Sequence, residues 1–446
     1  MSVLDALFNP ESIAVYGASL ADPDKLGSRL LANARAAQDA GQISVTAVHP
    51  KAAEFEDAHA VPSLDRPTDL ALISVPAAAA PAALADAVRA GARVAVVLSS
   101  GFGEAGPRGA QLQADLVGIA GEGGTRLIGP NCMGVLSRFG NGSWLNGSYF
   151  WDVPLRAGSI AFVSQSGAFG GMFLSELDRR SLGLSRFASL GNAADVTETD
   201  VIEWLGRDPA TRTIAVFSES IRDGRRFVDV TRKITVDKPV VLLKGGRSVG
   251  GTRAAMSHTG SLAGSYRTTQ AALRRAGVLM PTGSDEFFDA VTAADATTGR
   301  PRGGPSVAIV TVSGGPSVLA CDAAESAGLR VPVLTDRTRQ RLGAVLPHFA
   351  GTSNPVDLTP QCPADGFSPA VRAVYDDPGV DGVIAINCGL DVPEFGHAVA
   401  AAAASSGKPT TAFLLDVPQV RQRIVAAGIP CFDSPERAVR GYAAWV

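Results

Sequence analysis

The sequence predicts an α/β protein of three consecutive doubly wound blocks, near residues 1–140, 150–298 and 303–446. Short apolar runs that end in glycine, serine or proline turns recur along the chain, and alanine-rich stretches with helical character lie between them. Continuously apolar strands are typical of parallel sheets that are buried on both faces. The alternation of strand and helix favours βαβ units with right-handed crossovers.

Each block contributes three of the expected strands and the helices between them. Helical stretches include "APAALADAVRAGA" and "VLACDAAESAG". A polar, glycine-rich and aromatic segment without a clear period (138–159) and a Pro/Gly/Arg linker (296–306) separate the blocks. The strands are expected at 12–19, 70–76 and 93–102, at 159–171, 213–220 and 239–246, and at 306–315, 382–389 and 409–416.

Composition narrows the class of protein. The chain has 446 residues, of which 46% are hydrophobic and 19% charged, and its net charge of −3 with no Lys/Arg run argues against a nucleic-acid partner. No apolar run reaches the roughly 18 residues of a membrane span, and the N-terminus does not read as a signal peptide. The five dispersed cysteines form no CxxC pair, which argues against a zinc site and for a reducing compartment. A cytoplasmic protein is expected.

Three strand–turn–helix junctions, one at the head of each block, are candidate anion sites. They read "YGAS", "SQSGAFGG" and "VSGGPS", and such junctions offer free amides and the positive end of a helix dipole. The first lacks the G-x-G-x-x-G fingerprint, which makes a dinucleotide-dependent dehydrogenase an unfavoured alternative, and no P-loop motif occurs. For any single junction, a tight turn without a ligand remains an equal alternative.

A histidine stands alone in "AAMSHTGSLAG" (254–264), which reads as a mobile loop of small residues. His258 has no second His, Cys or carboxylate at close spacing, so no metal site is expected. From the loop alone, an ordinary loop histidine remains the more favoured reading.

Several motifs, taken in order, resemble the nucleoside-diphosphate-forming acyl-CoA synthetases, the superfamily of succinyl-CoA synthetase. Their domain order is that of the ADP-forming acetyl-CoA synthetase α subunit. The resemblance implies a Rossmann-like CoA-binding domain followed by two flavodoxin-like ligase domains, the first of which carries a phosphohistidine loop. The motifs are "HPK", "SSGFGE", "GPNCMG", "SQSGA", "SLGNAADV", "SESIRDGRRF", "SHTGSLAG", "VSGGPS" and "NPVDL".

The same resemblance assigns the chemistry. It makes His258 the phosphohistidine and Glu219 the carboxylate that orients its ring, since a bonded carboxylate fixes the imidazole tautomer. Asn192 is expected near the acyl group or the phosphate. The amides expected to hold the transferring phosphate belong to Ser166, Gly167, Gly314 and Gly315.

Ten residues are expected to contact CoA, and some of their surroundings depart from the family. The loop before Lys25 and the segment after Lys51 differ from the family pattern, and Tyr266 stands where an acidic residue is common. The last two departures can mark a different acyl substrate. The expected CoA contacts are Gly17, Ser19, Lys25, Lys51, Val75, Pro76, Ser100, Gly101, Phe102 and Asn131.

The resemblance implies the reaction acyl-CoA + phosphate + ADP ⇌ carboxylic acid + CoA + ATP, through an acyl phosphate and phospho-His258. No ATP-grasp domain is evident in the sequence, so we expect a separate β subunit that carries Mg²⁺ and the nucleotide, in a hetero-oligomer. The alternative is a CoA- or acyl-CoA-binding sensor or scaffold that has lost phosphotransfer. The sequence leaves open the acyl group and the choice between ADP and GDP.

Overall fold

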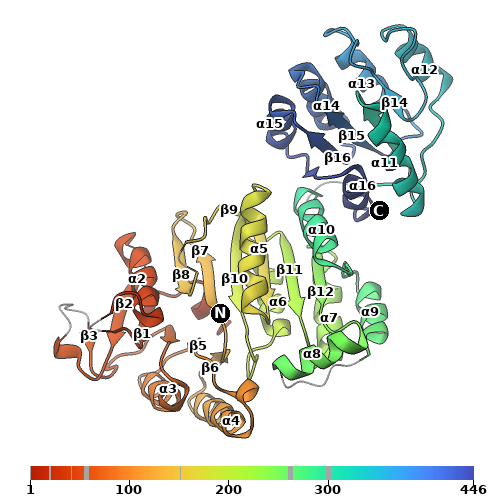
Figure 1. Cartoon of the computed structure of the whole chain (residues 1–446). Helices are drawn as coiled ribbons and strands as arrows, with labels where there is room; N and C mark the ends of the chain where they lie inside the picture. Colours follow the sequence, from red (N-terminus) through yellow and green to blue (C-terminus); the bar gives the residue numbers. More distant parts are fainter. Residues whose placement is uncertain are drawn as a thin grey trace. The chain divides into compact units, whose positions relative to one another are not determined.

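The computed structural model forms two compact units, residues 1–280 and 281–446 (Figure 1). For 255–259 and 297 the description covers the backbone only. The structure describes residues 2–19, 22–41, 43–54, 60–150, 152–259, 265–297 and 303–446.

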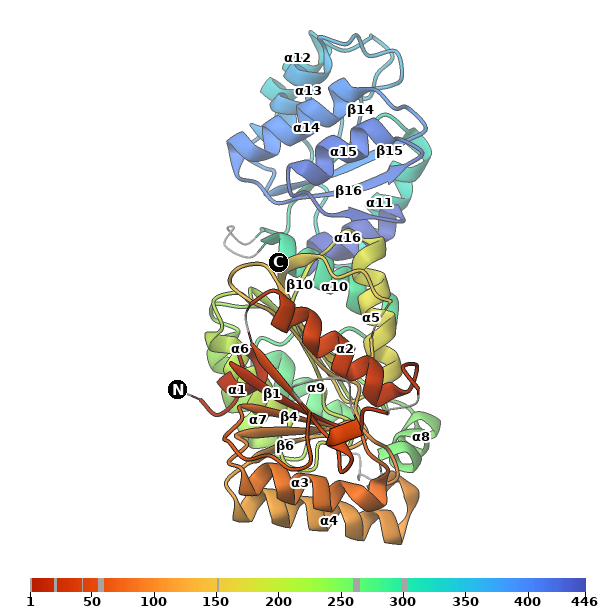
Figure 2. The ribbon, with the colours of Figure 1, turned by 90° about the vertical axis from the view of Figure 1, so that its left-hand side faces the viewer.

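The first sheet has six parallel strands in the order β3-β2-β1-β4-β5-β6, which is the order of a dinucleotide-type Rossmann sheet. Helix α2 (Leu26–Asp39) packs on one face, while α3 (Ala80–Arg89) and α4 (Pro107–Glu122) pack on the other (Figure 2). The strands are β1 (Ser12–Tyr16), β2 (Ser44–Val48), β3 (Ala60–Val61), β4 (Leu70–Ile73), β5 (Val94–Val97) and β6 (Arg126–Ile128).

The second sheet follows the order β12-β11-β9-β10-β7-β8. Its four parallel strands have the flavodoxin-like order, and β7 and β8 add an antiparallel hairpin at the β10 edge. The strands are β7 (Gly134–Arg138), β8 (Trp144–Ser148), β9 (Ala157–Ser164), β10 (Leu184–Ser189), β11 (Thr213–Ser218) and β12 (Val240–Lys244). The helices are α5 (Gly167–Arg179), α6 (Glu198–Arg207), α7 (Gly224–Ile234), α8 (Val249–Thr259) and α9 (Tyr266–Arg275).

The hairpin corrects the expectation that 138–159 is irregular. Residues 144–148 form β8, and β7 begins before this segment and enters the second sheet, so the first sheet ends at β6. The hairpin also joins the two sheets, because α2 packs on β8 and one buried cluster runs from α1 (Asp5–Phe8) and the first sheet into the second.

The second unit contains a five-stranded parallel sheet in the flavodoxin-like order β14-β13-β15-β16-β17. The strands are β13 (Val307–Thr311), β14 (Val356–Asp357), β15 (Gly382–Cys388), β16 (Thr410–Leu415) and β17 (Cys431–Phe432). The helices are α10 (Ser284–Thr297), α11 (Gly314–Ser326), α12 (Asp336–Gly343), α13 (Phe367–Tyr375), α14 (Pro393–Ser406), α15 (Pro418–Ala426) and α16 (Pro435–Ala443).

Helix α10 packs within this second unit, and the predicted extent of the middle block, 150–298, stays a prediction. The helix packs on α16. The carboxylate of Asp289, 1% exposed, accepts hydrogen bonds from Nε and Nη2 of Arg437, and the Trp445 indole N–H donates to the Ala293 carbonyl. These buried polar contacts fix α10 to the last helix of the chain.

The predicted α/β class with three parallel-rich sheets is confirmed. Within the described ranges, no helix is both long and apolar enough to cross a membrane.

Candidate active site

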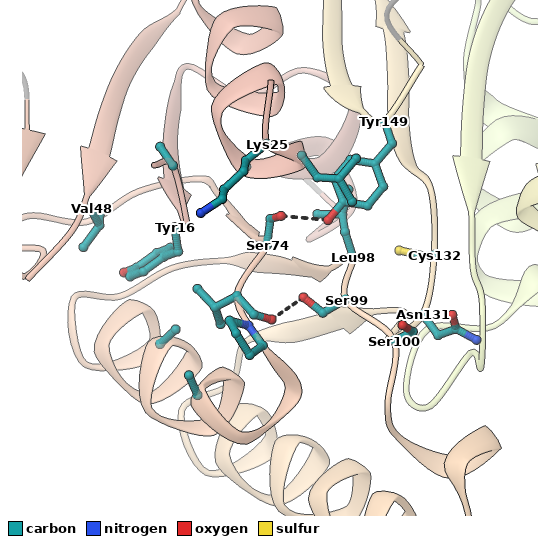
Figure 3. A pocket seen from close by; sticks show the side chains of 18 of the residues that line it. Tyr16, Lys25, Val48, Ser74, Leu98, Ser99, Ser100, Asn131, Cys132 and Tyr149 are labelled. Atoms are coloured by element: carbon teal, nitrogen blue, oxygen red, sulfur yellow. Dashed lines mark hydrogen bonds between the residues drawn. The ribbon is translucent and has the colours of Figure 1, made fainter. Parts of the chain in front are cut away.

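A cavity of about 1260 Å³ opens at the carboxyl ends of the strands in the first unit. It is lined from the first sheet by the ends of β1, β2, β4 and β5, and from the second by the ends of β9 and β10. The carboxyl edge of a parallel sheet is the usual place for a ligand in such folds. Figure 3 shows Tyr16 and Lys25 at one end of this cavity and Ser100 and Asn131 at the other.

Two glycines bring the start of helix α2 to this cavity. A Cβ atom on Gly17 would lie 2.1 Å from the Ser74 carbonyl oxygen, and one on Gly27 would lie 2.0 Å from the Gly17 carbonyl oxygen. Only glycine therefore allows the start of α2 to approach the β1 turn so closely. Leu26 and Gly27, the first residues of α2, line the cavity beside Lys25, so a helix N-terminus and an ammonium group are available to an anion.

Most of the expected CoA contacts meet at this cavity, and three do not line it. The Lys51 ammonium lies 3.2 Å from the Glu54 carboxylate on the surface, and Phe102 is fully buried. Gly101 holds the side chain of Glu104 through its amide. The roles of these three in CoA binding stay predictions. The seven that line the cavity are Gly17, Ser19, Lys25, Val75, Pro76, Ser100 and Asn131.

Asn192 is fixed at the far end by a polar network that joins the two sheets. Its amide nitrogen donates to Glu104 at 2.6 Å and to Gln113 at 2.9 Å, and its carbonyl oxygen accepts from Asn131 at 3.3 Å. Burial alone would raise the pKa of Glu104, but the hydrogen bonds from Asn192 and from backbone amides, Gly101 among them, hold it below its ordinary value. Glu104 therefore stays ionised and anchors Asn192.

The middle of the cavity is neutral. Burial raises the pKa of the Cys132 thiol to about 12, so this thiol carries no charge near neutral pH. Burial likewise raises the pKa of Tyr149 to about 12, and its hydroxyl lies 2.7 Å from that of Ser74 (Figure 3). No group of three or more His, Cys, Asp or Glu side chains able to hold a metal ion occurs among the residues that the structure describes.

The junction between β9 and α5 supplies the expected phosphate amides. Ser166 caps α5 by accepting a hydrogen bond from the Phe169 amide, and Gly167 begins the helix and lines the cavity. A Cβ atom on Gly167 would lie 2.5 Å from the Met133 side chain, so a larger residue would not fit there. Gly314 and Gly315 begin α11 in the second unit. Whether they converge with Gly167 stays a prediction.

The comparisons with known proteins agree with this geometry. Residues 11–138 match the CoA binding domain, 157–294 the succinyl-CoA ligase-like flavodoxin domain, and 307–412 the ligase-CoA domain. The α subunit of ADP-forming acetate–CoA ligase II of Pyrococcus furiosus is 35% identical over 97% of this chain and 95% of its own length. The chain belongs to the nucleoside-diphosphate-forming acyl-CoA synthetase superfamily.

Other members of the superfamily add to this assignment. ADP-forming acetate–CoA ligase I of Archaeoglobus fulgidus is 36% identical over 98% of this chain, which spans 62% of that longer protein. A structure from Ca. Korarchaeum cryptofilum, a dinucleotide-forming acetyl-coenzyme A synthetase in complex with phosphate and ADP, superposes with a TM-score of 0.89 at 31% identity. The superposition covers 99% of this chain and 96% of that one.

Glu219 and His258 are the two residues expected to carry out phosphotransfer. The structure describes all of Glu219 but only the backbone of His258. Glu219 directly follows β11. The backbone of His258 lies in the last turn of the helix α8, which corrects the expectation of a loop and accords with the helix-favouring Ala254, Ala255 and Met256 before it. The His258 side chain and residues 260–264 lie outside the described residues. Cα atoms of α8 come within 8 Å of those of η3 (Gly103–Ala105), the turn that carries Glu104.

Sequence reasoning missed several polar side chains of this site. Gln165 lines the cavity and also binds the turn of Glu219, and Glu104 and Gln113 hold Asn192. Gln165 and Glu104 lie within motifs that the resemblance singled out, "SQSGA" and "SSGFGE", each just beyond a buried strand. That position was the available signal, but their partners come from remote parts of the chain.

Proposed function

We propose that this chain is the α-type subunit of an acyl-CoA synthetase that interconverts acyl-CoA, phosphate and ADP with a carboxylic acid, CoA and ATP. The observation that carries the proposal is the single cavity shared by the CoA-binding sheet and the first ligase sheet. Its far end holds Gln165, whose side chain binds the backbone of Glu219. A thioester bound along the cavity would therefore bring its carbonyl toward the expected phosphotransfer residues.

Different residues along the cavity would bind different parts of the acyl-CoA. Lys25 and the first amides of α2 would hold the phosphates of CoA, and Asn131 with Asn192 would meet the thioester end. A phosphate oxygen would attack the thioester carbon, so that the C–S bond breaks and CoA leaves with a proton as the thiol. The amide of Gly167 would stabilise the negative charge on the phosphate during this step.

His258 would then take the phosphoryl group. One imidazole nitrogen attacks phosphorus, the bond from phosphorus to the acyl oxygen breaks, and the carboxylate leaves. The Glu219 carboxylate would accept a hydrogen bond from the N–H of the other ring nitrogen and would stabilise the imidazolium that forms. The phosphoryl group passes from His258 to ADP, which regenerates the free imidazole.

The nucleotide step calls for a partner in this proposal. The Pyrococcus furiosus relative is named as an α subunit, and the Archaeoglobus fulgidus relative has a greater length than this chain spans. Both are consistent with an ATP-grasp β subunit that supplies Mg²⁺ and the nucleotide, either separately or fused.

Reconstitution tests this function. The chain is mixed with a β subunit of the family, ATP, Mg²⁺ and CoA, and loss of free thiol is followed across a panel of carboxylic acids. We expect acid-dependent thiol loss only when both subunits are present. ATP-driven thioester formation by the chain alone would contradict the division of labour. CoA binding without turnover for any acid in the panel would favour the sensor or scaffold.

A further inference from the structure

The turn that carries Glu219 is held by one buried side chain from the neighbouring strand. Gln165, 6% exposed, directly follows β9, which pairs with β11. Its carbonyl oxygen accepts from the amide of Glu219 at 2.7 Å and from that of Ser220 at 3.0 Å. Its amide nitrogen donates to the Ser220 carbonyl at 2.8 Å and to the Glu198 carboxylate at 3.0 Å. The carboxamide oxygen also accepts from the Ser218 hydroxyl at 3.4 Å, so the carboxamide makes five hydrogen bonds, three of them to backbone groups of the turn.

A second buried side chain holds the same residue from the other neighbouring strand. Lys244, 9% exposed, ends β12, and Ser218 is its register partner at the end of β11. Its ammonium donates to the carbonyl oxygens of Glu219 and Gly245. Burial lowers the pKa of Lys244, an effect that the carboxylates of Glu219 and Glu198 oppose.

Both peptide groups of Glu219 are therefore bonded to side chains rather than to a strand ladder. β11 ends at Ser218, so its ladder gives Glu219 no support. Gln165 binds the N–H and Lys244 binds the C=O, from opposite neighbours of β11 in the sheet. Fixing the backbone on both sides of one Cα limits where its side chain can point.

We propose that Gln165 and Lys244 are positioning residues that set the direction of the Glu219 carboxylate. The inference rests on the proposed function, in which that carboxylate orients His258. Misplacement of a catalytic group by about 1 Å costs about 100-fold in rate. Loss of the contacts that Gln165 or Lys244 makes with the turn therefore slows phosphotransfer without removing a group that touches the phosphate.

The test measures the rate at which labelled phosphate is incorporated into the full chain in a single turnover. The acyl-CoA used is that of the acid that turns over in the reconstitution panel. Gln165→Met keeps the side-chain length, Lys244→Met shortens the side chain by one atom, and both remove the hydrogen bonds. Each is expected to slow labelling about 10- to 100-fold. The matched control is Ser185→Ala, which removes a buried hydrogen bond to Thr211 in the same unit. It is expected to lower the melting temperature while leaving the labelling rate unchanged.

A double-mutant cycle separates positioning from a general loss of stability. In a Glu219→Gln background, Gln165→Met or Lys244→Met is expected to change the rate less than about 2-fold, because each acts through the same carboxylate. Undiminished labelling in the single variants, or full additivity in the cycle, would overturn the inference.

Failure of the inference and failure of the proposed function give different results. If Glu219→Gln slows labelling and the two methionine variants do not, only the inference fails. If Glu219→Gln labels at the wild-type rate, the inference fails together with the orienting role of Glu219, whereas the proposed function fails only if reconstitution gives no acid-dependent thiol loss. Lys244 does not line the cavity, so Lys244→Met decides the matter if Gln165→Met does not fold or loses CoA binding.

Discussion

Replacing Glu198 by glutamine should stabilise the first unit by an amount that grows as the pH rises from about 4.5 to 7 and is complete above pH 7. Glu198 begins α6 with 2% exposure, and burial raises the pKa of its carboxyl from 4.5 to about 7. The native state therefore binds this proton more tightly than the unfolded chain does. Below pH 4.5 both states are protonated and no penalty exists. As the pH rises from about 4.5 to 7 the native state loses about 3 kcal/mol of stability, and this loss persists above pH 7.

Glu198→Gln removes this penalty, since the neutral amide keeps an acceptor for Gln165. The first unit spans residues 1–280, for which about 3 kcal/mol corresponds to a shift of about 5 °C in melting temperature. Thermal unfolding is followed at pH 5 and pH 8.5. We expect the variant to melt about 5 °C above wild type at pH 8.5, and the gap to shrink toward zero at pH 5.

The matched control lies on the same helix. Glu203 is partly exposed, with 44% of its side chain accessible, and pairs with Arg226, so Glu203→Gln should shift the melting temperature little at either pH. Equal shifts for Glu198→Gln at both pH values, or a destabilised variant at pH 8.5, would refute the reasoning from burial.

Three further outcomes are expected. Calorimetry should show that the chain binds CoA and not NAD; a preference for NAD would overturn the assignment of the first domain. Gly27→Val should weaken CoA binding at least about 10-fold, because a side chain there collides with the Gly17 carbonyl; unchanged affinity would show that the start of α2 does not contribute to CoA binding. Asp289→Ala should destabilise the second unit by about 2 kcal/mol, because Arg437 loses its buried partner and keeps the more exposed carboxylate of Asp433, with CoA affinity unchanged; destabilisation of both units in the melting profile would contradict the division at residue 280.

The sequence was sufficient for strands with a continuous apolar run and insufficient for strands of mixed composition and for contacts between distant parts of the chain. β1, β9 and β13 each contain an apolar run in which every residue is buried, at 13–16, 160–163 and 307–310. The β7–β8 hairpin has strands of the same length as β1, but glycine and polar residues interrupt their apolar residues, so its pattern resembles that of a linker. The place of α10 depends on Asp289 meeting Arg437, a contact across 148 positions of the chain.

The candidate site divides in the same way. The glycine turns, Lys25, Gly167 and Asn192 follow strand ends, and their gathering at one edge is a consequence of parallel topology. Gln165 and Lys244 could not be assigned from the sequence, because their role comes from the backbone groups of Glu219 that they bind. Lys51 reads as a phosphate ligand from its motif, and its surface pairing with Glu54 appears only in the folded chain.

The central claim is that His258 carries the phosphoryl group, and labelling tests it most directly. The full chain is incubated with labelled phosphate and a panel of acyl-CoAs, without a β subunit. We predict label that is acid-labile and base-stable, as expected of a phosphoramidate, with the cognate acyl-CoA. His258→Asn should abolish this label while leaving CoA affinity unchanged. Undiminished labelling of His258→Asn with the same acyl-CoA would place the phosphate elsewhere and contradict the mechanism.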